Sequence, residues 1–454
     1  MKIPLPDNLG PIARAFSGAG VPVYAVGGLV RNTLLRLPPS DVDICSALTP
    51  EQVETLCQGT TLRVIPKAPA FGTVEIHGPG GLTVEHTTFR SDSYPRGGAH
   101  QPDRVVLGGT LKTDAFRRDF TVNALYADLF TGEIQDPTGG LRDLTQKLLR
   151  TTSPDPEEIL GSDALRVLRL VRFSAELDFS PEEETFQAAR RYGKQLSQIA
   201  PERLRQELEK ILLCDGRYPG RDGRVLTALE RLDQLSAWET LFPDLARCRG
   251  LEQRKDYHRY DVLTHSFHVC AETPPVEKLR LAGLLHDIGK AQCLSDTGNL
   301  HAHAAYSTAI ARRDLTNLRY PTATIQTVCA LVEGHMFDLQ NTAREDTLRV
   351  RFAAWGRERT RDMILLREAD IRGSGYETAY MQTRWRTLYE IMLADGTPFS
   401  MEELAVTGRE IMDALDMAAG PEVGRVKERL FAHCARFPGD NTRERLLARL
   451  KDFQ

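Results

Sequence analysis

Hydrophobic and polar positions alternate in two different ways along the chain, and the change falls near residue 150. Before it, short β-rich runs are mixed with helical stretches and separated by Gly/Pro turns, which is typical of an α/β or α+β domain. After it, nearly every stretch has helical periodicity. We therefore predict an α+β head over 1–150 and an all-α body, divided into a neck and linker over 151–250, a helical domain over 251–390 and a helical tail over 391–454.

The first chemical pattern is a turn between a strand and a helix. Residues 23–26 predict a short buried strand, which Gly27 and Gly28 break into a turn that a phosphate could approach closely. Helical periodicity follows over residues 29–37. Arg31 lies in the first turn of this predicted helix, beside the N-terminus where anions bind.

Two carboxylates follow in an extended segment. Strand alternation puts Asp41 and Asp43 on one face, while Val42 and Ile44 face a core. Two acids aimed at one point repel each other unless a cation lies between them, which is the requirement of a Mg²⁺ site that handles a triphosphate. Either half of the pattern alone is a weak signal, because Gly-Gly turns and Asp-x-Asp pairs are common in ordinary structure.

Together the two halves resemble the signature of the nucleotidyltransferase superfamily that includes DNA polymerase beta. The order G-G-x-V-R before D-x-D is similar to class II tRNA nucleotidyltransferases (CCA-adding enzymes) and bacterial poly(A) polymerases. Residues 117–124 (RRDFTVNA) and 136–144 (DPTGGLRDL) match the second and third motifs of that family. In the second motif, Arg118 supplies a planar fork suited to phosphate, and Asp119 can orient the arginines. One departure is Asn32, where the family usually has Asp; the turn is expected to survive, although a charge at the helix start is lost.

A predicted helix after residue 160 has a polar residue at every third position. These residues form one winding ridge: Asp163, Arg166, Arg169 and Arg172. Three arginines without neighbouring acids are costly for a structural helix, and a triphosphate would explain them. Asp163 and Arg166 can also present an acceptor and a donor to a base edge. The family motif here is Glu-Asp-x-x-Arg, so Ser162 replaces a residue that would support this pair. Residues 201–208 resemble the next helical motif of the family, which we interpret as structural.

The segment between these motifs predicts a hairpin and a loop. Residues 71–77 and 82–88 alternate around a Gly-Pro-Gly-Gly turn and are expected to lie beside the Asp41/Asp43 strand. Glu85 would then be a third metal carboxylate or a solvent-facing strand residue. Residues 89–102 are rich in Ser, Gly, Arg and Pro and predict a mobile loop; the resemblance implies that this loop is needed for the final A addition.

A second constellation begins near residue 257. Its members have the order of an HD-domain phosphohydrolase: His265, His286, Asp287 and Asp370. Neutral imidazoles and carboxylates hold a borderline divalent metal such as Ni, Mn, Co or Mg, which activates water toward a phosphoester. His303 and His335 would carry a second ion or be exposed helix-cap residues. The whole domain could instead be a structural arm.

Composition sets outer bounds on these hypotheses. The chain lacks an apolar run long enough to span a bilayer, so no membrane partner is expected. Its eight cysteines are scattered without metal-ligand spacing, which favours a reducing cytoplasm. The formal net charge is −4, so a nucleic acid must be bound by local basic surface, for which the basic residues of the tail are a candidate.

The resemblance thus implies an enzyme that builds the CCA 3′ end of tRNA from CTP and ATP without a nucleic-acid template. Asp41 and Asp43 would hold Mg²⁺, and Asp163 and Arg166 would read the base. The triphosphate would be cradled by Gly28, Arg31, Arg118, Arg169 and Arg172. The alternatives are an enzyme that adds only the terminal A, a poly(A) polymerase, and an HD phosphohydrolase with a vestigial head.

Overall fold

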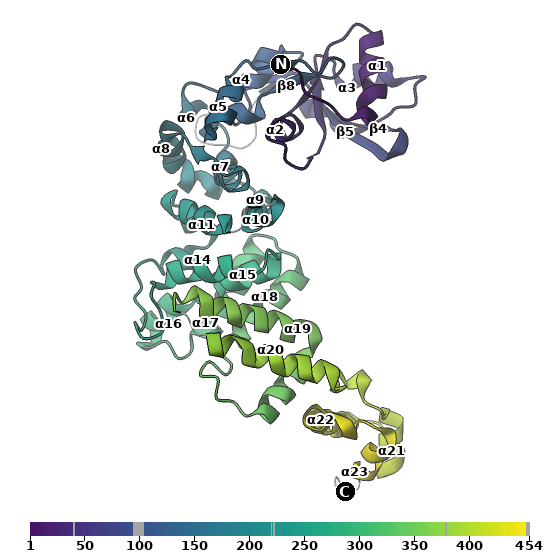
Figure 1. Cartoon of the computed structure of the whole chain (residues 1–454), viewed down its shortest axis with the longest axis vertical. Helices are drawn as coiled ribbons and strands as arrows, with labels where there is room; N and C mark the ends of the chain where they lie inside the picture. Colours follow the sequence, from purple (N-terminus) through teal and green to yellow (C-terminus); the bar gives the residue numbers. More distant parts are fainter. Residues whose placement is uncertain (40, 94–103, 219, 221–222, 377–378, 451–454) are drawn as a thin grey trace. The chain divides into compact units, whose positions relative to one another are not determined.

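The chain divides into two units, Met1–Leu241 and Phe242–Gln454. They are seen in a computed structural model that describes residues 1–39, 41–93, 104–218, 220, 223–376 and 379–450 (Figure 1). The first unit contains a mixed α/β head and a group of helices. The described part of the second unit is helical throughout.

A seven-stranded mixed sheet forms the centre of the head. Its strand order is β3 (Arg63–Ala68), β4 (Thr73–Gly78), β5 (Leu82–Thr88), β2 (Asp43–Ser46), β1 (Val23–Val26), β8 (Tyr126–Asp128) and β9 (Ile134–Gln135). Strand β1 is antiparallel to β2, with Val26 opposite Asp43. The β4–β5 hairpin lies next to β2, with Glu85 opposite Asp43 in parallel register. The predicted first strand and the predicted hairpin beside the carboxylate strand are therefore confirmed.

The head helices are short and cover the sheet or connect its strands. They are α1 (Gly10–Gly18), α2 (Gly28–Leu35), α3 (Pro50–Cys57), α4 (Leu111–Phe116) and α5 (Gly140–Gln146). One part of the core consists of Val26, Cys45, Phe89, Ala124 and Tyr126, which brings strands β1, β2 and β8 into contact with the chain around α4. Burial of such side chains is the main stabilising term in a small α/β layer.

Three predicted boundaries in the head need correction. Strand β2 begins at Asp43, so Asp41 precedes it. Helix α2 ends at Leu35 because Arg36 takes a left-handed conformation with φ 55°. The stretch predicted as a loop begins with a strand, β6 (Arg90–Ser93), which pairs with β7 (Arg104–Leu107). Residues 94–102 of that prediction lie outside the described residues.

Helices complete the first unit. They are α6 (Pro156–Leu160), α7 (Leu165–Leu177), α8 (Glu183–Tyr192), α9 (Pro201–Leu212), α10 (Cys214–Arg217), α11 (Arg224–Gln234) and α12 (Trp238–Leu241). Helix α7 packs against both α9 and α11, and its aliphatic positions are almost fully buried. The helix predicted from its apolar and arginine periodicity is thus confirmed. Its polar ridge runs along a packed face, so each arginine must find a partner there.

The second unit is built around helices that bring distant histidines together. In order they are α13 (Pro243–Ala246), α14 (Val262–Glu272), α15 (Glu277–Leu285), α16 (Lys290–Thr297), α17 (His303–Asn317), α18 (Thr322–Gly334), α19 (Glu345–Gly373), α20 (Ala379–Ala394), α21 (Gly408–Leu415), α22 (Pro421–Arg436) and α23 (Arg443–Arg449). Helix α14 packs between α15 and α19. Helix α19 is kinked at Gly356, whose φ of 79° favours glycine.

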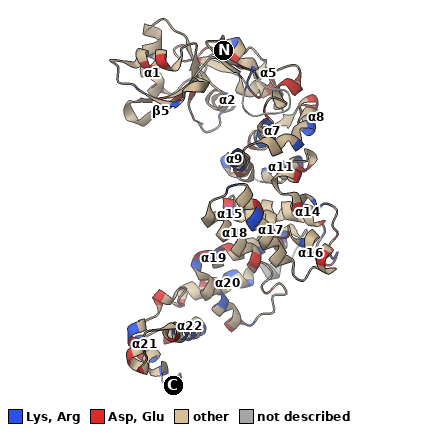
Figure 2. Cartoon of the chain, turned by 180° about the vertical axis from the view of Figure 1, so that it is seen from behind, with Lys and Arg blue, Asp and Glu red and all other residues tan. Residues whose placement is uncertain are grey.

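Acidic and basic residues are interspersed along the helices of both units (Figure 2). Within the described ranges, no helix is both long and apolar enough to cross a membrane. All eight cysteines lie in those ranges, and each is a buried thiol.

Candidate active sites

The two carboxylates predicted to hold a metal lie at the start of strand β2, next to the glycine turn. Gly27 has a φ of 73°, and a Cβ atom built there would lie 3.7 Å from Asp43 Oδ2. The positive φ would strain a side chain at this position, while a distance of 3.7 Å is an ordinary contact. The backbone conformation of the turn therefore favours glycine here, and the turn lies next to Asp43.

Asp43 lies in a field that disfavours its charge. Its pKa is raised to about 6, because burial and the nearby charges of Glu85 and Asp41 together outweigh the opposite effect of Arg118 and Lys67. A carboxyl group with a raised pKa gains stability when a cation approaches. The donor set of two aspartates and a neighbouring glutamate is one that suits a hard divalent cation.

Glu85 already has a cationic partner. Its Oε2 lies 2.7 Å from Lys67 Nζ, which also contacts Glu75. The side chain is more than one-third exposed, so this ion pair is weak. Glu85 therefore shares the face of Asp43 while pairing with a flexible lysine.

Arg118 is anchored beside the carboxylates by residues that sequence reasoning missed. Its Nε donates to Asp114 Oδ2 and to the Tyr126 hydroxyl, each at 3.0 Å. Arg117 also binds Asp114, which is fully buried. The expectation that Asp119 orients these arginines is wrong, because Asp114 holds both. The i,i+4 spacing of Asp114, on helix α4, and Arg118, just after the end of that helix, was the available signal.

Three arginines gather around the ring of Phe173. The guanidinium carbons of Arg31, Arg169 and Arg172 lie 5.0, 5.2 and 4.1 Å from its centroid. We call these three residues the arginine cluster. The structure thus brings Arg31 from helix α2 together with the ridge of α7, and cation–π contact holds the group in place.

The prediction that this ridge lacks neighbouring acids is wrong. Arg169 Nη2 lies 2.6 Å from Asp119 Oδ2, and Arg172 Nε donates to Glu207 Oε2 at 2.7 Å. The acids are 50 and 35 residues away in the sequence, so local spacing could not reveal them. Glu207 belongs to helix α9, whose motif was interpreted as purely structural.

Arg31 differs from the other two because its hydrogen-bond acceptors are amides. It donates to Asn123 Oδ1 and, through Nε and Nη2, to Asn32 Oδ1. The side chain is only 4% exposed, and burial lowers its pKa. A buried guanidinium bound by neutral oxygens retains most of its attraction for an anion.

Asn32 fits its site as an amide. While its oxygen accepts from Arg31, its nitrogen donates to the Pro38 carbonyl at 2.8 Å and to the Tyr218 hydroxyl at 3.0 Å. A carboxylate could not donate to the carbonyl. The asparagine at position 32, where the family motif usually has aspartate, therefore satisfies the hydrogen-bonding groups around it.

The two predicted base readers lie where helix α7 begins, and the backbone N–H of Arg166 donates to the Asp163 carbonyl at 2.9 Å. Arg166 donates to the backbone oxygens of Ile159 and Arg117 and to Ser162 Oγ. Asp163 accepts from Arg203 at 3.2 Å and from the α7 backbone. Ser162 thus supports Arg166 from the position of the family glutamate.

The second candidate site lies among the helices of the second unit. Its ligand atoms form two groups, each within 4.8 Å: His265, His286 and Asp370, and then Asp287, His303 and His335. The alternative that His303 and His335 are exposed caps is wrong, since they are 3% and 7% exposed. The shortest contacts in the first group are 3.0 Å from His265 Nε2 to Asp370 Oδ1 and 3.2 Å between the Nε2 atoms of His265 and His286.

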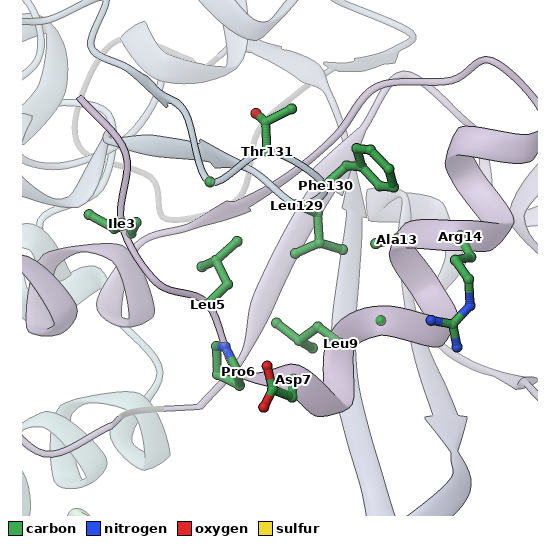
Figure 3. Close-up of a pocket in the computed structure, with 12 residues that line it drawn as sticks. Ile3, Leu5, Pro6, Asp7, Leu9, Ala13, Arg14, Leu129, Phe130 and Thr131 are labelled. Atoms are coloured by element: carbon green, nitrogen blue, oxygen red, sulfur yellow. The ribbon is translucent and has the colours of Figure 1, made fainter.

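A pocket of about 340 Å³ also opens on the head, between the N-terminal segment and the turn after strand β8 (Figure 3). Leu5, Leu9 and Phe130 line it, with Asp7 and Arg14 at its side. None of the candidate site residues contributes to its lining.

Comparison with known proteins divides the chain in the same way. Residues 23–150 match the poly A polymerase head domain, 178–248 match a probable RNA- and SrmB-binding site of polymerase A, and 256–372 match the HD domain. Three consecutive segments of the chain are thus similar to a poly A polymerase head, an RNA-binding segment of polymerase A and an HD domain. The likeness of the head implies a divalent metal ion there, and the aspartate pair provides suitable ligands.

Two curated relatives are CCA-adding enzymes of lactic acid bacteria. That of Lactiplantibacillus plantarum is 40% identical over 223 residues, which cover 49% of this chain and 52% of the relative. That of Leuconostoc citreum is 37% identical over 245 residues, which cover 52% and 58%. The chain thus spans about half the length of the curated relatives it matches.

Solved structures extend the likeness in fold to nearly the whole chain. The CCA-adding enzyme of Bacillus stearothermophilus in complex with CTP has a TM-score of 0.72 at 24% identity, covering 99% of this chain and 98% of that one. The Thermotoga maritima CCA-adding enzyme complexed with tRNA has a TM-score of 0.61 at 19% identity, covering 98% and 95%. At these identities the likeness establishes the fold.

Proposed function

We propose that this chain builds the CCA 3′ end of tRNA by template-independent transfer of nucleotides from CTP and ATP. The observation that carries the proposal is the glycine turn between β1 and α2. Its first residue abuts Asp43, and the helix that it begins delivers Arg31 to the arginine cluster. One turn therefore joins a candidate metal site to a candidate phosphate site, as nucleotidyl transfer requires.

Each group has a defined role in this proposal. Asp41 and Asp43 would hold Mg²⁺, which supplies Lewis acidity for the 3′-hydroxyl and for the leaving pyrophosphate. Arg118, beside Asp43, and the arginine cluster would balance the charge of the triphosphate. The backbone N–H of Gly28 lies in the first turn of α2, where an anion is favoured. The arginines are held in place before the substrate binds, which lowers the reorganisation cost.

Base choice would depend on Asp163 and Arg166. The Asp163 carboxylate and the Arg166 guanidinium would present an acceptor and a donor to the base edge. Of their supports, Arg203 belongs to helix α9, and Ser162 lies in the turn between α6 and α7. Because rigid hydrogen-bonding groups discriminate better than mobile ones, this arrangement is suited to choosing C or A.

The test uses transcripts of one tRNA that end before CCA, after C and after CC, each incubated with labelled CTP, ATP, GTP or UTP. Complete CCA on all three transcripts is the expected result. Addition of A to the CC transcript alone would favour an A-adding enzyme, and long A tails on unrelated RNA would favour a poly(A) polymerase. Absence of incorporation with every divalent metal would refute the proposal. Asp43→Asn, nearly identical in shape, is the matched inactive control.

A second function is favoured by the histidine cluster. We propose that the HD domain hydrolyses phosphoesters, with water activated at a divalent metal held by His265, His286, Asp287 and Asp370. The test is release of phosphate or opening of 2′,3′-cyclic nucleotides with Mn²⁺, Co²⁺, Ni²⁺ and Mg²⁺ in turn. No hydrolysis with any of them would leave the structural-arm interpretation. We place both activities in the cytoplasm, which suits buried thiols and a tRNA substrate.

A further inference from the structure

We propose that Tyr218 is a positioning residue for the triphosphate site, where it holds Arg31 in place through the amide of Asn32. This inference rests on the proposed nucleotidyl transfer and adds to it a residue from outside the head. Tyr218 directly follows helix α10, is 3% exposed and lies 186 residues from Asn32 in the sequence. The contact therefore connects the helices after the head to a candidate phosphate site within it.

The orientation of the Asn32 amide is determined by a group that can only accept. The Pro38 backbone oxygen has no hydrogen to donate, so the amide nitrogen must lie toward it, at 2.8 Å. The same nitrogen donates to the Tyr218 hydroxyl at 3.0 Å. The amide oxygen is then directed at Arg31, from which it accepts at 3.1 Å from Nε and 3.0 Å from Nη2. Both ends of this fully buried amide are thereby satisfied.

Tyr218 also affects the charge of the guanidinium. Burial lowers the pKa of Arg31, and Tyr218 opposes this effect, in part through a side-chain hydrogen bond. On its other side, Arg31 donates from Nη1 to Asn123 Oδ1 at 2.5 Å. The guanidinium is therefore held between two amide oxygens, and the Tyr218 hydroxyl keeps one of those amides in the required orientation.

This support is needed because the guanidinium groups of the arginine cluster repel one another. Burial and the nearby charge of Arg172 both lower the pKa of Arg31. The other two members of the cluster are held by carboxylates, Arg169 by Asp119 and Arg172 by Glu207. Arg31 is hydrogen-bonded to amide oxygens, so its position depends on the geometry of neutral groups.

The pairing of an asparagine with a tyrosine also leaves the Arg31 charge available to phosphate. Glu176 is a negative charge near Arg31, but it lies 3.4 Å from Arg172, which shares it. An amide at position 32 adds no second carboxylate in contact with the guanidinium. Since guanidinium groups bind phosphate through charge as well as hydrogen bonds, a neutral support favours triphosphate binding.

The test compares Tyr218→Phe with the wild type in nucleotide addition by the full chain. The substitution keeps the ring and removes the hydroxyl, which leaves a buried amide N–H without its acceptor. We expect KM for CTP and ATP to rise about 3–10-fold while kcat is nearly unchanged, because the phosphates are bound before and during the reaction. The inhibition constant of inorganic pyrophosphate should rise by a similar factor, since pyrophosphate carries the phosphates without the base.

Tyr192→Phe is the matched control. It removes the same hydroxyl from helix α8 of the first unit, where Tyr192 contacts Glu157 at 3.5 Å, a residue of no candidate site. Both constants should keep their wild-type values in this control. Melting temperatures of all variants are measured first, so that the kinetics are taken well below unfolding.

Asn32→Asp is the second variant, and it decides the matter if Tyr218→Phe does not fold. It keeps the shape of the side chain, but its carboxylate pairs with Arg31 and turns an oxygen toward the Pro38 carbonyl. We expect KM and the pyrophosphate inhibition constant to rise at least as much as in Tyr218→Phe. Wild-type affinity for CTP and pyrophosphate in Asn32→Asp would overturn the role of the amide.

Wild-type constants in Tyr218→Phe, or a lowered kcat with an unchanged KM, would overturn the positioning role. If the wild type adds no nucleotide, the proposed function fails, and calorimetry of pyrophosphate binding to the full chain then tests the inference by itself. Weaker binding by Tyr218→Phe than by Tyr192→Phe would still support the role of Tyr218. Equal binding by the two variants, or no binding by the wild type, would overturn it.

Discussion

Asp119 joins the head to helix α7, and its replacement by asparagine should weaken the first unit by a predictable amount. One carboxylate oxygen accepts from Arg169, and the other accepts from Asn123 Nδ2 and from the Phe120 backbone N–H. The side chain is 6% exposed. Asp119→Asn keeps the shape of the residue and removes its charge, so the effect isolates electrostatics.

The pKa of Asp119 gives the magnitude. Burial alone would raise it, but the charge of Arg169, the hydrogen bond from Asn123 and the charge of Arg166 outweigh burial and lower the pKa from 3.8 to about 2. That difference corresponds to about 2 kcal/mol of stabilisation at neutral pH. In a unit of this size, about 2 kcal/mol lowers the melting temperature by roughly 4–8 °C.

The sign of the pH dependence follows from the lowered pKa. The native state binds the proton of Asp119 less readily than the unfolded state, so its contribution is complete well above pH 3.8 and is lost as the pH falls toward 2. At pH 3 the advantage of the wild type over the variant should shrink to about half, roughly 1 kcal/mol. The asparagine variant has no corresponding titration.

Scanning calorimetry of the full chain at pH 7 and pH 3 measures both quantities. The exposed Asp7 provides the control, since Asp7→Asn removes the same charge from the surface and should change the melting temperature by little. An Asp119→Asn chain as stable as the wild type at pH 7, or an equal loss at both pH values, would refute the assigned charge pairing.

Three further predictions concern the chemistry. Asp41→Ala or Asp43→Ala should abolish nucleotide addition, measured by incorporation of labelled CTP, and leave the melting temperature unchanged. Incorporation near the wild-type rate would contradict the metal assignment. Asp163→Ala should reduce the discrimination between bases by about 1–3 kcal/mol, which is measured by competition between CTP and UTP. If the variant still excludes UTP as strictly as the wild type, the base-reading role is wrong. His286→Ala with Asp287→Ala should remove metal-dependent hydrolysis while CCA addition falls little; loss of both with a lowered melting temperature would indicate a structural role.

Elements fixed by neighbouring residues were predictable from the sequence. The strand at Val23–Val26, the β4–β5 hairpin and helix α7 each follow from a period that nearby apolar side chains impose. The boundaries of strands and helices were less predictable. Strand β2 begins two residues after Asp41, and helix α2 ends before Arg36, whose left-handed conformation is not marked by any periodicity.

Charge balance around the candidate site was only partly predictable. Spacing marks two local pairs at i,i+4, Arg172 with Glu176 and Arg118 with Asp114. Asp119 and Glu207 instead reach Arg169 and Arg172 from distant segments. These distant pairs depend on tertiary contacts, for which sequence spacing carries no signal.

Asn32 shows how a departure from a motif is accommodated by its surroundings. An aspartate there would offer Arg31 a charge, but its second oxygen would meet the Pro38 carbonyl oxygen at hydrogen-bond distance, where only a donor is tolerated. The asparagine gives up that charge and donates to Pro38 and to Tyr218, 186 residues away. Arg31 is thereby fixed by neutral hydrogen-bond acceptors, with Glu176 as a nearby negative charge. For a residue proposed to bind a triphosphate, this loss of a carboxylate increases the attraction for the substrate.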